Sequence, residues 1–518
     1  MKYLLLAIPT FFALISFGQH LNIRVDDPGV VSSPNEPSIM INPKNTEQIM
    51  AASNLNYYYT SNDGGYSWES HQLSSASNGV WGDPCIISDT AGAFYFMHLS
   101  NPADGEWIDR IVCQKTYDFG ESWPVDTYTG LNGDKAQDKE WAVVDRSNNN
   151  IYMTWTQFDD YGSNAPSDSS NIMFSKSFDG GESWSEAIRI NKIAGNCIDS
   201  DSTVEGAVPA VGPDGQVYVA WSGPDGIVFD KSYDQGESWL EDDIPVDPHP
   251  TGWDYDIPGI YRANGLPVTA CDTSQSPYRG TIYINWSDQR NGENDTDIWL
   301  AKSADEGATW SEPIRVNNDD AGNQQFFTWM TIDQTNGKLY FVFYDRRSLD
   351  GLATNVYLAM SEDGGETFFN YKINDEPFIA YSGYFFGDYT NITAHNNVIR
   401  PIWAESNTSM EIYTAIIDPL ALNEPQSATP VAEIKAYPNP FNRNFNIAFE
   451  NKKATNLTVE LFTIDGRNLM TFMDNQAMGP GEHHLEFQVP AEHLSTGVYY
   501  LKLIKDKDIE MKKMVCRP

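Results

Sequence analysis

The sequence Ser-Phe-Asp-Gly-Gly-Glu-Ser-Trp, at residues 177–184, is one of six similar stretches in this 518-residue chain. The shared pattern is Ser/Thr-x-Asp-x-Gly-x-Ser/Thr-aromatic, and successive copies lie 55 to 71 residues apart. A period of that length indicates an array of supersecondary units. The aspartates of the six copies are Asp63, Asp118, Asp179, Asp234, Asp305 and Asp363.

The composition of one copy indicates a folding device. An Asp side chain accepts hydrogen bonds from backbone N–H groups a few residues on, and so closes a turn. The Gly adopts a backbone conformation that other residues disfavour, and the aromatic ring packs into the layer below. The stretches resemble Asp-boxes, the repeats of bacterial neuraminidases. This resemblance implies a β-propeller in which each box joins the third and fourth strands of a blade, so we expect the six aspartates to be structural.

Composition supports an all-β fold. Aromatic residues make up 13% of the chain, with 38 Gly and 29 Pro, as in turn-rich β proteins. A seventh unit, residues 387–417, has three strand-like segments and no box. Residues 22–25 form a strand-like segment before the first blade, and pairing it with the last blade would close the ring and remove exposed sheet edges. We therefore predict a seven-bladed β-propeller, with six blades as the alternative.

The chain divides into four predicted parts. Residues 1–18 have the charged start, apolar run and small residues of a signal peptide, and the run is too short for a good membrane span. Residues 19–423 are the propeller with its Asp-box repeats, and residues 424–431 have the composition of a linker. Residues 432–518 contain alternating strands of a small C-terminal β-sandwich.

The last 87 residues also resemble a known export signal. From Tyr-Pro-Asn-Pro-Phe at 437–441 to Lys-Lys-Met-Val at 512–515, this segment resembles the C-terminal sorting domain of type IX secretion in Bacteroidetes. The resemblance implies a partner, the type IX secretion machinery, contacted through residues 432–518. It also implies passage through the periplasm to a secreted or outer-membrane surface location.

Charge excludes two classes of partner. The formal net charge is −39, and residues 432–518 hold 11 basic and 11 acidic residues, so the whole excess lies on the repeat region. Such a surface repels nucleic acid and anionic membranes. We expect no nucleic-acid partner, no membrane span in the mature chain, and a monomer.

No cofactor is required by the sequence, but Ca²⁺ is compatible with it. Residues 291–297 and 317–320 offer many oxygen ligands, either for Ca²⁺ or simply as solvated loops. The five cysteines are too scattered for a disulfide framework or a metal site. Cys85 and Cys113 could pair, or both could remain buried thiols.

Candidate site residues lie where the first strand of each blade begins. In a propeller these strands line the central channel, and ligands bind where they open on one face. The candidates for acid/base catalysis are Asp83, Glu140 and Glu205. The candidates for substrate binding are Glu36, Lys139, Arg262, Gln325, Asp388 and Tyr389. All of them could instead be polar contacts that close the ring.

The resemblance to sialidases implies a specific site. It implies three arginines that clamp a carboxylate, a Tyr nucleophile with a Glu partner, and an Asp acid/base. Glu205 lies where the Glu partner is expected, Arg262 could join the clamp, and Tyr389 or Tyr384 could be the nucleophile. The first strand reads Asn-Glu-Pro at residues 35–37, without the first arginine, so the clamp is incomplete.

Two hypotheses of function follow. The first is a secreted carbohydrate-active enzyme, a glycoside hydrolase or lyase that acts on extracellular polysaccharide or glycoconjugate. The second is a non-catalytic propeller that binds glycan or protein at the cell surface. The sequence does not decide between the two hypotheses, and we favour the enzyme. Trp253 and Tyr255, in a long loop before blade five, either stack on sugar rings or cover the core.

Overall fold

The computed structural model describes most of the chain as two compact units, residues 1–421 and 422–518. The predicted signal peptide and the predicted linker lie outside the described residues. Among the described residues there is no helix with the length and apolarity needed to cross a membrane. The described residues are 20–380, 382–406, 409–419, 422, 435–451, 454–463, 468–491, 494–495, 497–505 and 508–517.

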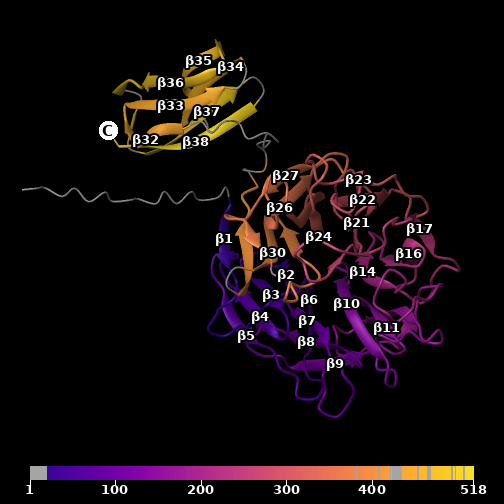
Figure 1. Cartoon of the computed structure of the whole chain (residues 1–518). Helices are drawn as coiled ribbons and strands as arrows, with labels where there is room; N and C mark the ends of the chain where they lie inside the picture. Colours follow the sequence, from indigo (N-terminus) through magenta and orange to yellow (C-terminus); the bar gives the residue numbers. More distant parts are fainter. Residues whose placement is uncertain are drawn as a thin grey trace, which may run out of the picture. The chain divides into compact units, whose positions relative to one another are not determined.

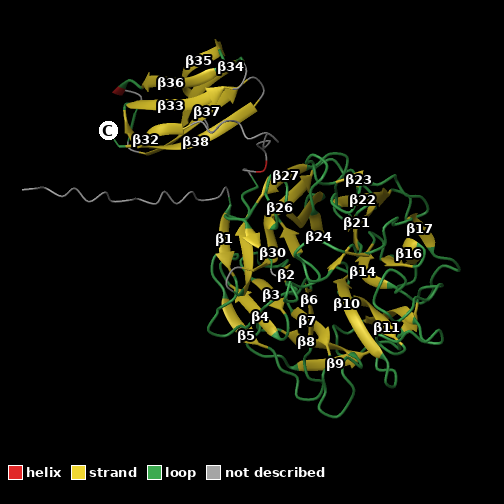
Figure 2. Cartoon of the chain, viewed as in Figure 1, coloured by secondary structure: helices red, strands yellow, loops and turns green. Residues whose placement is uncertain are grey.

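The described residues of the first unit form a ring of seven antiparallel sheets, six with four strands and one with five, so the prediction of a seven-bladed propeller is confirmed. Strands joined by loops build it throughout (Figure 2). The blades follow one another in sequence order around the ring (Figure 1). The strands, innermost first, are β2 (Ser38–Ile41), β3 (Ile49–Ser53), β4 (Tyr57–Ser61) and β5 (Glu69–Gln72) in blade one; β6 (Gly82–Ser88), β7 (Phe94–Leu99), β8 (Ile111–Thr116) and β9 (Val125–Thr129) in blade two; β10 (Ala136–Val144), β11 (Ile151–Phe158), β12 (Ser170–Ser177) and β13 (Ile188–Arg189) in blade three; β14 (Glu205–Val211), β15 (Val217–Gly223), β16 (Gly226–Ser232) and β17 (Ile244–Asp247) in blade four; β20 (Val268–Cys271), β21 (Ile282–Asp288), β22 (Asp297–Ser303) and β23 (Ile314–Arg315) in blade five; β24 (Gln325–Asp333), β25 (Lys338–Asp345), β26 (Ala353–Ser361) and β27 (Phe369–Lys372) in blade six; and β29 (Asn391–His395), β30 (Val398–Ser406), β31 (Met410–Ile416) and β1 (Leu21–Arg24) in blade seven.

Two shorter pairings complete this unit. Between blades four and five, β18 (Asp254–Tyr255) and β19 (Ala263–Asn264) form a small hairpin, and β28 (Phe378–Ile379) pairs with β26. The hairpin and its loop precede blade five, whose first strand begins at Val268. Trp253 and Tyr255 are buried in this region and cover the core.

The first strand of the chain closes the ring. β1 pairs antiparallel with β31, from Leu21 opposite Ile416 to Arg24 opposite Tyr413. The Arg24 guanidinium forms an ion pair with Glu411 at 2.7 Å, which fixes the register of the last blade. The pairing covers the edge of β31, and uncovered strand edges are sites of aggregation.

The core consists of rings packed within and between the blades. Trp155, Trp221, Trp286 and Trp403 occupy the second strands of blades three, four, five and seven and are fully buried. Second strands are covered on both faces by neighbouring blades, which explains their near-continuous apolar sequence. All five cysteines are buried and free, so the disulfide considered between Cys85 and Cys113 does not form.

Each Asp-box turn is closed by the same hydrogen bonds. In the box at residues 177–184, Asp179 Oδ1 accepts from the Ser177 hydroxyl at 2.8 Å and from the Ser183 N–H at 2.9 Å. The Gly181 N–H donates to Ser177 Oγ at 2.8 Å. Because the box follows β12, and this end of β12 pairs with the start of β11, it lies at the end of the blade opposite the start of the first strand.

The second unit is a β-sandwich with its own core. Its strands are β32 (Lys435–Asn442), β33 (Asn444–Asn451), β34 (Thr455–Thr463), β35 (Asn468–Met478), β36 (Gly481–Gln488), β37 (Gly497–Lys505) and β38 (Asp508–Cys516). β32, β33 and β36 form one layer, and β34, β35, β37 and β38 form the other, joined through the pairing of β32 with β38. The buried core includes Phe445, Leu461, Phe487 and Leu501.

Candidate active site

In four of the seven blades the first strand begins with a β-bulge. Extra residues interrupt the pairing of β6, β10, β14 and β24 with their second strands. Such bulges bend a strand and redirect its side chains, and they are frequent beside functional sites. Positive φ angles mark the equivalent position in five blades, at Glu36, Asp83, Lys139, Gly206 and Phe327. The bulges bring polar side chains from different blades together at one end of the propeller axis.

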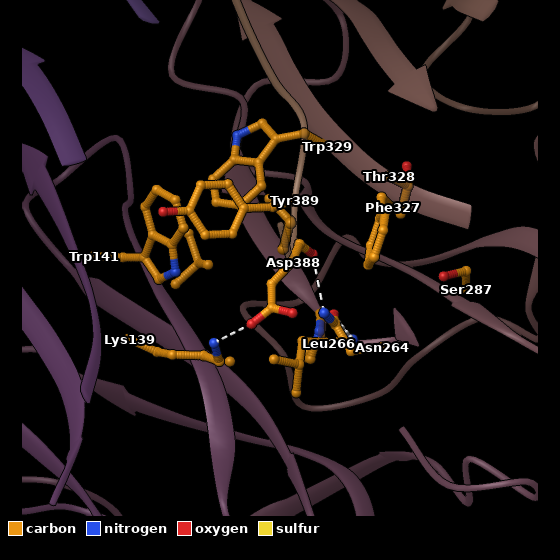
Figure 3. A pocket seen from close by; sticks show the side chains of 14 residues that line it. Lys139, Trp141, Asn264, Leu266, Ser287, Phe327, Thr328, Trp329, Asp388 and Tyr389 are labelled. Atoms are coloured by element: carbon orange, nitrogen blue, oxygen red, sulfur yellow. Dashed lines mark hydrogen bonds and ion pairs between the residues drawn. The ribbon is translucent and has the colours of Figure 1, made fainter. Parts of the chain in front are cut away.

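A buried ion-pair cluster forms the centre of this opening (Figure 3). Lys139 Nζ lies 2.5 Å from Asp388 Oδ2, and Arg262 Nε donates to Asp388 Oδ1 at 3.0 Å. Asn264 Nδ2 donates to the Asp388 carbonyl at 2.9 Å. Burial opposes ionisation of Asp388, but Lys139 and Arg262 outweigh it and lower its pKa to about 2. Asp388 is therefore a fixed negative charge that holds both cations.

Glu36 and Asp83 form a carboxyl pair beside this cluster. Glu36 accepts hydrogen bonds from Asn54 Nδ2 and from the Asp388 N–H, the latter at 3.1 Å. The Glu36 side chain lies beside the Asp83 carboxyl and opposes the rise in the pKa of Asp83. Burial, then the charges of Asp83 and Asp388, raises the pKa of Glu36 well above its usual range. Burial also raises the pKa of Asp83.

Glu140 and Glu205 are buried without a partner. They are 1% and 0% exposed, and neither carboxyl oxygen of either residue has a hydrogen-bond partner. Burial raises the pKa of both groups well above the usual range, and Asp83 adds to this for Glu140 and Asp199 for Glu205. Burial therefore favours the neutral, protonated form of both carboxyls. Unpartnered buried polar groups are rare in structural positions and are frequent at functional sites.

Asp138 joins these acids. It precedes Lys139 in β10, and its Oδ1 accepts from the Lys139 N–H at 3.0 Å. Burial raises the pKa of Asp138 to about 7 against the attraction of Lys139. A carboxyl with a pKa near 7 can donate and accept a proton at neutral pH.

Three aromatic rings lie below the charged cluster on the propeller axis. The ring centroids of Trp141 and Trp329 are 4.2 Å apart, and that of Tyr389 lies 5.0 Å from Trp141 (Figure 3). Trp141 and Trp329 line two cavities, one of about 30 Å³ beside Asp388 and one of about 490 Å³ lined by the first strands of all seven blades. The two indole rings therefore lie between the charged opening and the channel.

The structure places eight of the nine residues proposed from the sequence at this opening. These are Glu36, Asp83, Lys139, Glu140, Glu205, Arg262, Asp388 and Tyr389. Gln325 is the exception. Its side chain bonds Asn317 at 3.0 Å and Asp319 at 3.0 Å within the loops of blade six.

This geometry does not suit a tyrosine nucleophile. The Tyr389 hydroxyl is buried without a hydrogen-bond partner, and burial, with Asp83 and Glu36, raises its pKa well above the usual range. Tyr384 is 69% exposed, outside the buried cluster. Among the described residues, Arg262 is the arginine that pairs with Asp388, and it also binds Asp199 at 3.2 Å. A three-arginine clamp is therefore absent from the described residues.

Sequence reasoning missed four residues of the site. They are Asp138, Asp199, Asn54 and Asn264. Asp138 had a usable signal, because it stands next to Lys139 at the start of a first strand. Asp199 and the two asparagines come from loops that carry no recognisable motif.

The acidic loops considered for Ca²⁺ are internally paired. Asn317 Nδ2 donates to Asp297 Oδ1 and to Asp319 Oδ1, both at 2.6 Å. Arg315 lies 3.3 Å from Asp297. Within the described ranges, no group of three or more His, Cys, Asp or Glu side chains has a geometry that could hold a metal ion.

The chain has limited similarity to several solved structures. The microbial sialidase Hz136 from Hadza is 15% identical, with 72% of this chain and 74% of that chain covered and a TM-score of 0.41. NanB sialidase from Streptococcus pneumoniae is 9% identical, with 74% and 93% covered and a TM-score of 0.40. The α-L-arabinanase of Penicillium chrysogenum is 13% identical, with 79% and 100% covered and a TM-score of 0.44. At these values the similarities carry no argument about chemistry.

Comparison by sequence identifies the C-terminal unit. No curated protein is significantly similar to the chain in sequence. Residues 435–517 match the family of the secretion system C-terminal sorting domain. Residues 435–517 are thus a type IX sorting domain, and the chain is exported to the exterior of the cell or to its surface.

Proposed function

We propose that the opening at the propeller axis binds and hydrolyses an extracellular glycan. The observation that carries this proposal is the meeting of seven carboxyl groups and two cations at one opening. Asp388 is ionised, with a pKa of about 2, whereas Asp138 has a pKa of about 7. Glycosidases generally need one carboxyl that donates a proton and one that is ionised, each set by its surroundings.

In this proposal the neutral carboxyls supply the proton. Glu205, Glu140 or Asp138 protonates the leaving oxygen of the glycosidic bond, and the negative charge of the Glu36–Asp83 pair activates water or stabilises the sugar cation. Lys139 and Arg262 are held by Asp388 and orient sugar hydroxyls. Cleavage by elimination, as in a lyase, would use the same groups.

The charge balance favours neutral sugars. Both cations of the opening already pair with Asp388, and the remaining carboxyls leave an excess of negative charge. A sugar carboxylate would have to displace Asp388 from its ion pairs, whereas hydroxyl groups can bond the carboxyls directly. We therefore propose a neutral glycan and not a sialic acid as the substrate.

The test is a glycan-panel activity screen of the full-length exported protein. We expect turnover of a neutral polysaccharide, and we expect Glu205→Gln to lower kcat by roughly 10²- to 10⁴-fold because it removes a proton donor. Arg262→Lys should raise KM more than it lowers kcat. Wild-type turnover in both variants would exclude this site, and sialic acid release would exclude the preference for neutral sugars.

One observation favours a second candidate, a non-catalytic glycan-binding propeller. Glu140 and Glu205 are almost completely buried, so a substrate reaches them only if the opening rearranges. A binding protein would retain its affinity for glycan in Glu205→Gln and would turn over none of the glycans in the panel.

A further inference from the structure

Exposed aromatic rings flank the charged opening on one side. Trp81 is 37% exposed and Trp107 is 45% exposed, and their ring centroids are 5.7 Å apart in an edge-to-face arrangement. Trp107 also contacts Tyr161, with centroids 6.0 Å apart. We call Trp81, Trp107 and Tyr161 the aromatic wall. Indole rings are among the most favourable groups to bury, so two of them exposed together suggest a binding surface.

Three loops from two blades build the aromatic wall at the end of the propeller that holds the carboxyl cluster. Trp81 directly precedes β6, and Trp107 lies in the loop from β7 to β8. Leu99, at the end of β7, pairs with Gly82, the neighbour of Asp83. Tyr161 follows β11, whose last residue pairs with Ala136 at the start of β10.

Hydrogen bonds join the wall to the cluster. The Tyr161 hydroxyl donates to Asp199 Oδ2 at 2.9 Å, and Arg262 Nη1 donates to the same oxygen at 3.2 Å. Arg262 in turn holds Asp388. The wall and the ion-pair cluster are therefore parts of one connected surface.

The loop that carries Trp107 is fixed. Its neighbour Ile108 is 1% exposed and adopts a positive φ of 50°. The Ile108 N–H donates to the Ser100 carbonyl at 3.0 Å, and its carbonyl accepts from the Gln137 N–H at 2.7 Å. The anchored backbone holds the indole in water without collapse onto the core, so binding would require little ordering of this loop.

We propose that the aromatic wall is a stacking subsite for a second sugar unit, so that the opening recognises a chain of at least two neutral sugars. This inference rests on the glycan specificity proposed above. The C–H face of a pyranose or furanose ring covers an aromatic face, while its hydroxyls reach polar groups such as Asp199 and Arg262. The negative charge around the cluster favours a neutral chain over an acidic one.

The experiment measures how affinity depends on chain length. Binding of cello-, xylo-, manno- and arabino-oligosaccharides of one to six units to the full-length protein is followed by titration calorimetry. We expect the affinity for at least one series to increase from one unit to two or three, and we expect Trp107→Ala to weaken binding of the longer chains by roughly 5- to 10-fold. Trp81→Ala should also weaken binding of the longer chains, and it should leave the affinity for the single sugar unchanged.

Two variants control the result. Trp107→Phe retains a ring and should restore most of the affinity, which separates stacking from any loss of folding. Phe178→Ala removes a ring that is 56% exposed in an Asp-box, at the other end of the blade, and should bind as the wild type does.

The outcomes separate this inference from the proposed function. Equal affinity of wild type and Trp107→Ala for every chain length overturns the stacking subsite alone. Length-dependent binding that the Trp variants lose, without any turnover, supports the subsite and overturns only the hydrolysis. If the wild type binds no oligosaccharide of the four series, the neutral-glycan specificity and the subsite both fall, and a protein ligand becomes the alternative.

Discussion

The Asp388 carboxylate forms ion pairs with two cations, the buried Lys139 and the partly exposed Arg262. Lys139 is 9% exposed and pairs with Asp388 at 2.5 Å. Removing one member of a buried ion pair is more harmful than removing both, because the remaining charge keeps its desolvation penalty. Asp388 therefore stabilises the fold around the opening, in addition to any role it has in function.

A variant tests this role. Asp388→Asn should lower the free energy of unfolding by about 3 kcal/mol at pH 7, because Lys139 and Arg262 lose the charge that holds them. Chemical unfolding of the two proteins measures the difference. Asp199→Asn, whose Asp side chain is 17% exposed, should cost less than half as much. A loss in Asp388→Asn no greater than in Asp199→Asn would contradict the assignment.

Asp138 should make the fold less stable as pH rises. Its pKa is raised in the folded protein from 3.8 to about 7, so between these values the folded state binds more protons than the unfolded state. The stabilising protonated state is thus lost as pH rises toward 7. Asp138→Asn keeps the oxygen that accepts from the Lys139 N–H, and removes the ionisation.

We expect Asp138→Asn to stabilise the protein by about 2 kcal/mol more at pH 8 than at pH 5. Unfolding free energies at the two pH values measure this difference. A gain of equal size at both pH values would show that Asp138 titrates normally in the folded state.

The residues of the site were predictable where they follow from strand geometry. Lys139 and Glu140 were identified because polar side chains at the start of an inner strand face the axis. Gln325 met the same criterion, but its side chain enters the hydrogen bonds of Asp319 and not the opening. Whether a bulge turns a given side chain toward the axis depends on one or two backbone angles, which residue type alone does not determine.

At the scale of elements, each Asp-box turn is fastened by the blade before it. Lys115 Nζ donates to the Gly180 carbonyl at 3.0 Å, and Lys231 Nζ donates to the Glu306 carbonyl at 2.7 Å. The same contact joins Lys302 to Gly364 and Arg400 to Gly64. The aromatic residue of the box adds a contact in the same direction, as between Trp239 and Phe174 at 5.0 Å.

Removal of one such donor should loosen one blade junction. Lys176 Nζ donates to the Gln235 carbonyl at 2.8 Å and pairs with Glu237 at 2.6 Å. We expect Lys176→Met to lower the free energy of unfolding by about 1–2 kcal/mol, because the Gln235 carbonyl loses its charged donor. Lys338→Met is the control, because it removes a surface ion pair with Glu362. This variant should change the free energy of unfolding by about 0.5 kcal/mol or less. Equal effects would mean that the inter-blade contact is dispensable.

The elements predicted least well were those without a hydrophobic alternation. β32 contains Pro438 and Pro440, which sequence rules exclude from a central strand. β35 pairs with β34 through several register shifts, so its apolar residues do not alternate regularly. Aromatic exposure was also unpredictable. Trp253 was expected either to stack on sugar rings or to cover the core, and it is buried, whereas Trp81 and Trp107 are exposed because their loops are anchored elsewhere.

At the scale of the whole propeller, the sequence predicted the closed ring. The closing strand was predicted because blade seven lacked a fourth segment and the strand-like residues 22–25 had no blade of their own. What joins the blades at the axis could not be predicted, since it depends on contacts between residues as distant in sequence as Lys139 and Asp388.

Deletion of residues 20–25 should open the ring. The edge of β31 would lose its partner, and the buried Thr414 would be exposed to solvent. We expect the melting temperature of the propeller to fall by roughly 5 °C or more, with aggregation at high protein concentration. Calorimetry and size-exclusion chromatography measure both effects. An unchanged transition and a monomeric elution profile would show that three strands suffice for the last blade.

The aromatic rings at the axis determine how a ligand can enter and leave the propeller. Because Trp141 and Trp329 separate the opening from the channel, the axis of the propeller is closed at these two rings and is not a continuous tunnel. A polymer cannot be threaded from one face of the ring to the other. A polymeric ligand must therefore lie across the opening, and any product must leave through the same opening.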